Sequence, residues 1–111
     1  MDMIYISHPY TGNEEANKRH AERIRKHLQD KNPDVCYVLP LGMFGTNNTH
    51  YCQILAYCIE LERRCDAVLF CPGWENSAGC KAEMAVALQQ GMIIDYMNPC
   101  REDLSEEDED E

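Results

Sequence analysis

The sequence lacks a long apolar run and the marks of an export signal. None of its apolar segments reaches the roughly 18 residues that a membrane helix requires. The amino terminus has no basic start, and its apolar run is short and strand-like. We therefore expect a soluble, cytoplasmic protein without a membrane partner.

The seven cysteines include no CxxC pair, which is the usual sign of a structural zinc site. Their number is odd, and Cys58 and Cys65 are spaced for one face of a helix. In a reducing compartment cysteine serves as a small buried hydrophobe. These observations predict buried thiols and no metal site.

Basic side chains form no visible stripe, which argues against a nucleic-acid partner. Acidic side chains gather at the carboxyl end, where the last ten residues, Glu102 to Glu111, include eight acids and no base. The formal net charge is −10, and the chain without this segment carries −2. We predict one domain over residues 1–100 and a solvated, disordered tail over residues 101–111. A tail that docks on a basic partner is the alternative.

Short apolar segments alternate with amphipathic ones along the domain. Strands are predicted at residues 3–7, 35–39, 66–71 and 92–96, with helices between them. Residues suited to cap or stop these helices stand at their expected ends. They are Asn13 for the first helix, Thr46, Asn47 or Asn48 for the second, and Asn76 or Ser77 with Gly91 for the third. The alternation predicts an α/β fold, a small doubly wound, flavodoxin- or Rossmann-like parallel sheet of four to five strands with flanking helices.

Ligands of doubly wound sheets bind beyond the carboxyl ends of the strands, where the strand order reverses. If the first strand lies between the second and third, the loops at residues 7–12 and 72–79 meet there. The helices that follow both loops would begin in the same crevice. Because helix amino termini attract anions, this crevice is the predicted binding site.

Glu83 stands among small residues in the third predicted helix. It follows Ser77 by six positions, so a capping box does not explain it. Gly79 and Ala87 lie one turn to either side on the same face, and Gly79 leaves room for a ligand near the backbone. Glu83 either acts on a ligand held at the helix start or is an exposed glutamate near that start.

Four further residues each have a functional and a structural interpretation. Tyr10 either walls the pocket or covers the core, and Trp74 either stacks on a base or is a buried aromatic. Asp66 is either catalytic or an acid at the strand edge that orients a loop. Ser77 is a helix cap that can also bind a phosphate.

Three stretches of the sequence resemble the nucleoside 2-deoxyribosyltransferase superfamily. They read YISHPYTGNEEANK, CDAVLF and GWENSAGCKAEMAVALQQG, and the resemblance covers most of residues 3–96. The small uncharacterised branch called domain of unknown function 4406 is the most similar. The residues that carry the resemblance in the third stretch are Ser77, Gly79, Glu83 and Ala87.

The resemblance implies a reaction at an N-glycosidic bond, with Glu83 as the nucleophile that attacks the anomeric carbon. A carboxylate nucleophile of this kind forms a glycosyl-enzyme, as in retaining glycosidases. Serine at position 77 resembles the deoxynucleoside 5′-monophosphate N-glycosidases and implies a phosphorylated ligand, with Ser7 and Gly12 as further binding residues. The implied partner is a nucleoside or nucleotide, no cofactor is implied, and a homodimer or higher homo-oligomer is expected.

One position departs from the superfamily pattern. An aspartate that assists the departing base is expected near Cys58, and the region reads YCIELE instead. Glu60 or Glu62 would have to substitute, at a spacing we take to be wrong for that face. The absence leaves a non-catalytic nucleotide-binding protein as the alternative function.

Overall fold

The structure is a computed structural model that describes residues 1–41 and 51–97. The candidate caps Thr46, Asn47 and Asn48 and the acidic tail lie outside the described residues. Within them, no helix is both long enough and apolar enough to cross a membrane.

The described residues form a parallel four-stranded sheet in the order β2-β1-β3-β4. The first strand therefore lies between the second and third, which confirms the predicted reversal of strand order. The strands are β1 (Asp2–Ser7), β2 (Val35–Val38), β3 (Ala67–Phe70) and β4 (Ile93–Tyr96). The helices are α1 (Glu14–Lys31), α2 (Tyr51–Arg63), the short 3-10 helix η1 (Trp74–Asn76) and α3 (Ala78–Gln90).

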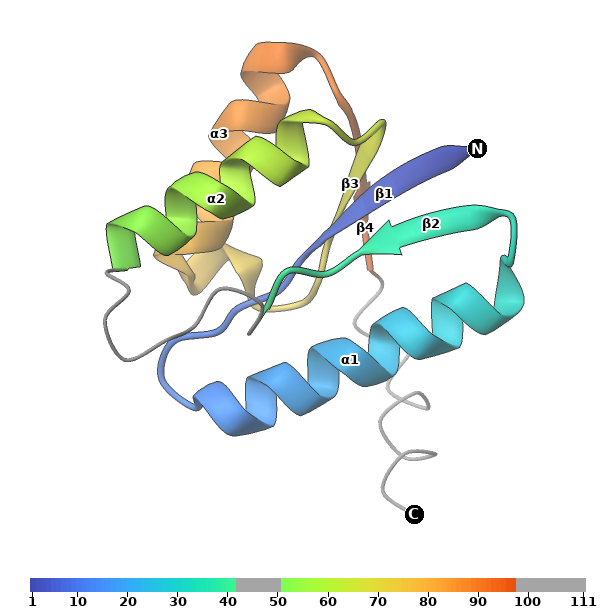
Figure 1. Ribbon diagram of the computed structural model, residues 1–111. Coiled ribbons are helices and arrows are strands. Elements are labelled where there is room, and N and C mark those ends of the chain that lie inside the picture. The colour runs from blue at the N-terminus through green and yellow to red at the C-terminus, as the bar shows by residue number, and fades with distance from the viewer. Residues whose placement is uncertain (42–50, 98–111) are drawn as a thin grey trace.

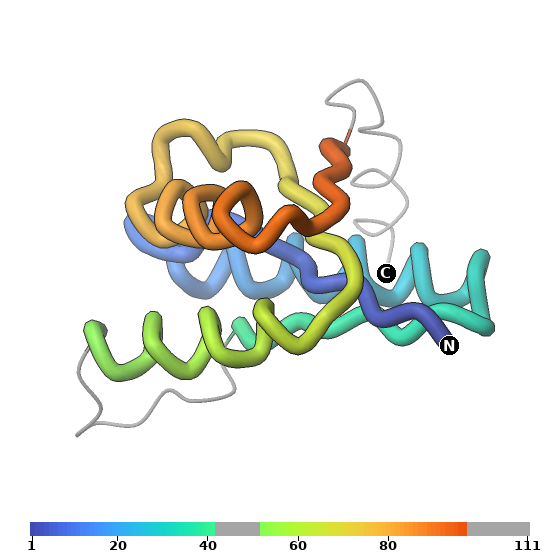
Figure 2. Tube along the Cα trace, turned by 90° about the horizontal axis from the view of Figure 1, so that it is seen from above, coloured from blue at the N-terminus to red at the C-terminus, as the bar shows by residue number. Residues whose placement is uncertain are grey.

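Helices cover both faces of the sheet, so the predicted doubly wound α/β fold is confirmed. Helix α1 covers one face, and α2 and α3 lie side by side on the other (Figures 1 and 2). Each face has its own apolar cluster. Between the sheet and α1, Ile24 of the helix packs with Ile6 and Cys71. Between the sheet and α2 and α3, Ala87 of α3 packs with Tyr5 and Phe70.

Strand β1 alternates between these two clusters. Ile6 points toward α1, and its neighbours Tyr5 and Ser7 point toward α3, because successive side chains of a strand project to opposite faces. All three side chains are 1% exposed. A polar hydroxyl on each of two buried residues therefore faces the same side of the sheet.

Helix α3 has the predicted ends. The Ser77 hydroxyl accepts a hydrogen bond from the Cys80 amide at 3.2 Å, as a helix cap does. At the other end Gly91 adopts φ 69°, a left-handed conformation that favours glycine and ends the helix. Ser77 thus fixes where α3 begins, and Gly91 fixes where it ends. The start of the helix in turn sets how far Glu83 lies from the crevice.

Candidate active site

The carboxyl ends of β1 and β3 border a hollow of about 590 Å³. This volume is in the range of small-molecule sites. Two loops and the start of α3 provide its walls. The lining residues are Pro9, Thr11, Gly73, Asn76, Ser77 and Ala78.

Glu83 lies in the second turn of α3, the helix whose first residue lines the hollow, and both of its carboxyl oxygens accept hydrogen bonds. The Ser7 hydroxyl donates to Oε1 at 2.6 Å, and the Tyr5 hydroxyl donates to Oε2 at 2.7 Å. The side chain is only 7% exposed. The interpretation of Glu83 as an exposed surface glutamate is therefore wrong, and small neighbours on its helix let β1 approach it.

Burial and hydrogen bonding act in opposite directions on Glu83. Burial is the larger effect and raises the pKa of its carboxyl above the ordinary value, and the hydrogen bonds from Ser7 and Tyr5 oppose this rise. The pKa of Tyr5 is itself raised by burial and by the negative charge of Glu83. Tyr5 therefore remains a hydroxyl donor, and the two donors favour the ionised form of Glu83.

The start of α3 provides the side of the hollow suited to an anion. Ser77 lines the hollow, and Gly79 follows in the first turn of the helix. The first amide groups of a helix have no intrahelical acceptor and point outward from its start. A phosphate placed in the hollow would thus meet amide donors at a positive helix end.

Asp66 lies at the opposite end of the sheet from this crevice. Its carboxylate accepts a hydrogen bond from the Met3 amide at 2.8 Å, next to the amino end of β3. Met3 is four residues before Ser7 along β1, or about 13 Å at the usual rise of a strand. This placement argues against the predicted catalytic role of Asp66 and fits its alternative as a strand-edge acid.

Two other residues have contacts that differ from their predicted binding roles. Ser7 was expected to hold phosphate, but its hydroxyl is 1% exposed and donates to Glu83. Trp74 was expected to contact a base, but its ring packs 5.2 Å from Phe70 and 5.9 Å from Tyr96 between centroids. Trp74 thereby joins the apolar cluster beneath α3.

Tyr10 and Gly12 flank Thr11, which lines the hollow. Tyr10 is 39% exposed, so it does not cover the core. Gly12 has φ 110°, a conformation that favours glycine and turns the loop toward α1. Both remain predicted ligand contacts at the rim of the hollow.

Sequence reasoning missed Tyr5 and misjudged Glu62. The alternation of MIYIS was the available signal for Tyr5, because it places positions 5 and 7 on one face. Glu62 lies one turn after Cys58, so both share a face of α2. The expectation that its spacing was wrong is therefore incorrect, and Glu62 is fully buried, with 0% exposure.

The loop after β1 is also held by two histidines. The His8 Nδ1 lies 2.7 Å from the Pro9 carbonyl oxygen, and its Nε2 lies 2.8 Å from the His20 Nδ1. Because a carbonyl only accepts, His8 donates through Nδ1 and accepts from His20 through Nε2. Burial, together with the charge of His20, lowers the pKa of His8 to about 4.

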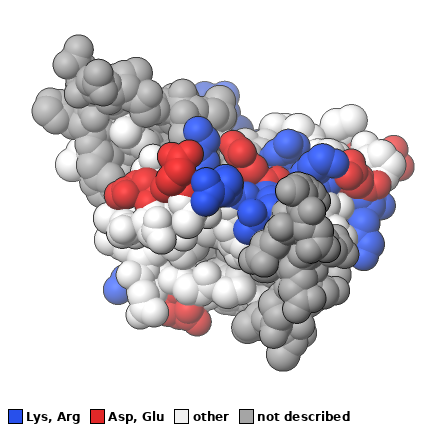
Figure 3. All heavy atoms as spheres, turned by 90° about the horizontal axis from the view of Figure 1, so that it is seen from below, with Lys and Arg blue, Asp and Glu red and all other residues white. Residues whose placement is uncertain are grey.

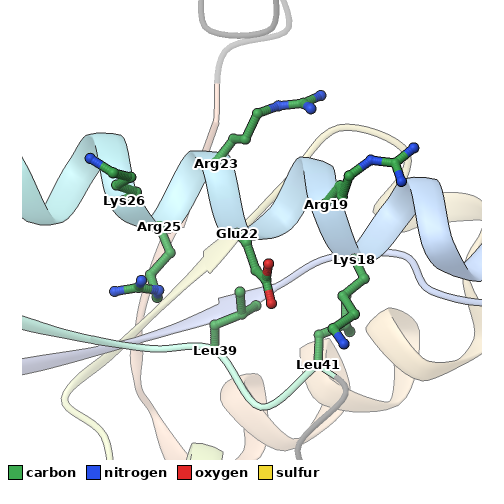
Figure 4. A pocket seen from close by; sticks show the side chains of 8 residues that line it. All are labelled: Lys18, Arg19, Glu22, Arg23, Arg25, Lys26, Leu39 and Leu41. Atoms are coloured by element: carbon green, nitrogen blue, oxygen red, sulfur yellow. The ribbon is translucent and has the colours of Figure 1, made fainter. Parts of the chain in front are cut away.

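A second hollow, of about 680 Å³, lies along α1, and basic side chains gather on this face of the molecule (Figure 3). Glu22 points toward Leu39 and Lys18 toward Leu41 across it (Figure 4), and Arg25 also lines it. Arg19, Arg23 and Lys26 complete the lining. The structure thus brings together on α1 basic side chains that the sequence analysis did not recognise as a stripe.

Among the described residues, no group of three or more histidines, cysteines or acids is placed to hold a metal ion.

Comparison with known proteins supports this architecture. The family called Domain of unknown function (DUF4406) matches residues 2–96. The chain belongs to the DUF4406 family. The match spans the sheet and helices of the described residues, including Glu83 and its two hydroxyl partners. No curated protein sequence matches significantly.

The DUF4406 chain shares its fold with the solved structure of a 2-desoxiribosyltransferase from Leishmania mexicana. The TM-score is 0.67 at 22% sequence identity, over 87% of this chain. The match spans 64% of the Leishmania chain. At this identity the similarity establishes the fold, and it confirms the predicted resemblance at that level.

Proposed function

We propose that this DUF4406 protein cleaves or transfers the N-glycosidic bond of a nucleoside or its 5′-monophosphate, with Glu83 as nucleophile. The observation that carries the proposal is the arrangement of Glu83, a buried carboxyl group in the helix that borders the hollow, whose two oxygens accept from Ser7 and Tyr5. The fold shared with a 2-desoxiribosyltransferase agrees with it.

Two hydroxyl donors suit a carboxylate that must remain ionised in a buried place. In the proposed reaction a Glu83 oxygen attacks the anomeric carbon as the bond to the base nitrogen breaks. An ester between Glu83 and the sugar forms, and the base takes a proton from water as it leaves. Water or a second base then attacks the same carbon and releases Glu83 as carboxylate. Ser7 and Tyr5 orient the carboxylate through both steps, since each binds one oxygen.

The start of α3 favours a phosphorylated substrate. Ser77 lines the hollow at the amino end of the helix, where free amides and the helix dipole attract an anion. We assign the 5′-phosphate to this place. We assign the sugar to the space between it and Glu83, next to the rim residues Tyr10 and Gly12.

The test is an incubation of the protein with ribo- and deoxyribonucleosides and their 5′-monophosphates, with chromatography for released base. We expect release from at least one member and loss of release in Glu83→Gln, which keeps the shape of the side chain. Thermal stabilisation of Glu83→Gln by the same substrate shows that binding survives. Release that persists in Glu83→Gln would falsify the role of Glu83.

A nucleotide-binding protein without turnover is the second candidate. Cys58 stands where the superfamily carries an aspartate, and burial raises the pKa of its thiol to about 11. A missing general acid costs about 10²- to 10⁴-fold in rate. If no substrate releases base, yet one of them raises the melting temperature of the protein, this second candidate replaces the first.

We also expect a homodimer formed through α2. Cys52, Ala56 and Tyr57 are exposed on this helix, opposite the buried Glu62. Light scattering of the intact protein, compared with Tyr57→Glu, tests this interface. A mass of one chain for the unchanged protein would contradict it.

A further inference from the structure

Glu62 is a buried carboxyl group without a hydrogen-bond partner among the described residues. Its side chain has 0% exposure, and neither carboxyl oxygen is bonded. The neighbouring Arg63 and Arg64 do not serve it, because both pair with Glu60 at the surface of α2. An unpaired carboxylate in such a place is strongly unfavourable, so the group avoids the charge by keeping a proton.

Glu62 belongs to the layer that holds Glu83. Helix α2 packs against α3, and the two helices lie side by side (Figure 2). Cys58, one turn before Glu62, packs in the same cluster as Tyr5, whose hydroxyl donates to Glu83. The negative charge of Glu83 acts on Glu62 directly and, after burial, is the second cause that raises its pKa to about 8.

Hydrogen bonding decides which of the two glutamates is ionised. Glu83 has two hydroxyl donors, which stabilise a negative charge. Glu62 has none among the described residues. The negative charge of the pair is therefore better stabilised on Glu83, and its proton on Glu62.

The other titratable groups around this pair stay neutral over the same range. Cys58 and Cys65 interact electrostatically with Glu62, and burial raises the pKa of each thiol to about 11. The pKa of Tyr5 is raised further still by burial and by Glu83. Unlike these two thiols and the Tyr5 hydroxyl, Glu62 thus changes its charge near a mildly alkaline pH.

We propose that Glu62 is a positioning residue that, while protonated, keeps Glu83 as the single anion of the site and so sets its alkaline limit. This inference rests on the proposed role of Glu83. Glu62 does not touch substrate, because it is fully buried near the carboxyl end of α2, whereas the crevice lies at the helix amino ends. It acts through its charge. Once ionised, it adds a second negative charge behind Glu83 and repels a phosphorylated substrate.

The way in which stability changes with pH follows from the raised pKa of Glu62. The folded-state pKa of Glu62 is raised from 4.5 to about 8, so the folded protein holds this proton where the unfolded chain has lost it. Its contribution to stability is complete in acid and is lost as the pH rises through about 8. Substrate affinity falls over the same range, with KM rising about tenfold for one added like charge.

The experiment compares the pH dependence of base release between pH 6 and 9.5 for the unchanged protein and for Glu62→Gln, which mimics the protonated side chain. We expect KM for the 5′-monophosphate to rise on the alkaline side, with kcat little changed, and this rise to vanish in Glu62→Gln. Glu60→Gln is the matched control, since Glu60 lies on the same helix at the surface, and it should keep the rise.

A second measurement does not depend on turnover. Carbon-13 NMR of the glutamate carboxyls should show one resonance that titrates near pH 8, is absent in Glu62→Gln, and titrates at lower pH in Glu83→Gln. A Glu62 resonance that titrates in the ordinary acid range, or an alkaline rise in KM that persists in Glu62→Gln, overturns the inference. If no base is released at any pH, the proposed function is contradicted instead. The NMR titration then still shows whether Glu62 and Glu83 share one proton.

Discussion

The Tyr5 hydroxyl lies 2.7 Å from the Glu83 Oε2, although 78 residues separate them in the chain. Tyr5 is in the central strand, and Glu83 is in the helix that follows the neighbouring strand. A hydrogen bond to a buried charge contributes more than one between neutral groups. The contact therefore links the core of the domain to the ionisation of its candidate nucleophile.

Tyr5→Phe removes this donor while it keeps the ring in the core. We expect the pKa of Glu83 to rise, because one of the bonds that lowers it is lost. Base release should fall about 10- to 100-fold at neutral pH, and its acidic limb should move toward higher pH. Tyr37→Phe is the matched control, since the Tyr37 hydroxyl accepts from Asn32 outside the site. An equal loss in both variants would point to general damage to the fold.

Ser7 and Ser77 should differ in their dependence on the substrate phosphate. Ser7→Ala removes a donor to Glu83, so release from nucleosides and from their monophosphates should fall by the same factor. Ser77→Asp preserves a good helix cap but adds a negative charge at the hollow. The expected result is little change in melting temperature and a rise of about tenfold or more in KM for the monophosphate alone. Equal effects of Ser77→Asp on both substrate types would remove Ser77 from the phosphate site.

His8 should make the fold sensitive to acid. Its folded-state pKa of about 4 lies below its ordinary value of 6.5, so the unfolded chain binds a proton first as the pH falls. Stability should therefore be lost from pH 6.5 down to 4, by up to about 3 kcal/mol for a single group. Urea unfolding at pH 7 and pH 4.5 measures this loss.

The comparison for this effect is His8→Asn, in which the difference in stability between the two pH values should shrink. His27→Asn changes a histidine of α1 outside the pair and should leave the difference as it is. An unchanged difference in His8→Asn would assign the acid sensitivity to other groups.

Asp66 should have no direct role in the reaction. Asp66→Ala removes the bond to the Met3 amide and should cost about 1 kcal/mol of stability. Base release from the folded variant should stay within about twofold of the unchanged protein, because the crevice is at the other end of the sheet. A loss of 100-fold with the melting temperature preserved would return Asp66 to the list of catalytic candidates.

The sequence by itself determined the local elements, because their signals lie within a few residues. The alternation of apolar strands and amphipathic helices specified the α/β class, and Ser77 and Gly91 specified the ends of α3 through cap geometry. The placement of Glu83 among small residues, one turn beyond Gly79, marked it as a candidate, and the family resemblance implied its role as nucleophile. Each of these inferences depends on spacing along one element.

Only the tertiary structure decided which side chains meet Glu83. Tyr5 and Ser7 reach it because β1 is central in the sheet and α3 packs on that face, which are contacts between distant parts of the chain. The same fold buries Glu62 in the helix packed against α3 and leaves Asp66 at the amino end of β3. The sequence alone does not show whether a given glutamate or aspartate is buried, hydrogen-bonded or exposed. Its charge, its partners and its use depend on the neighbours that folding supplies.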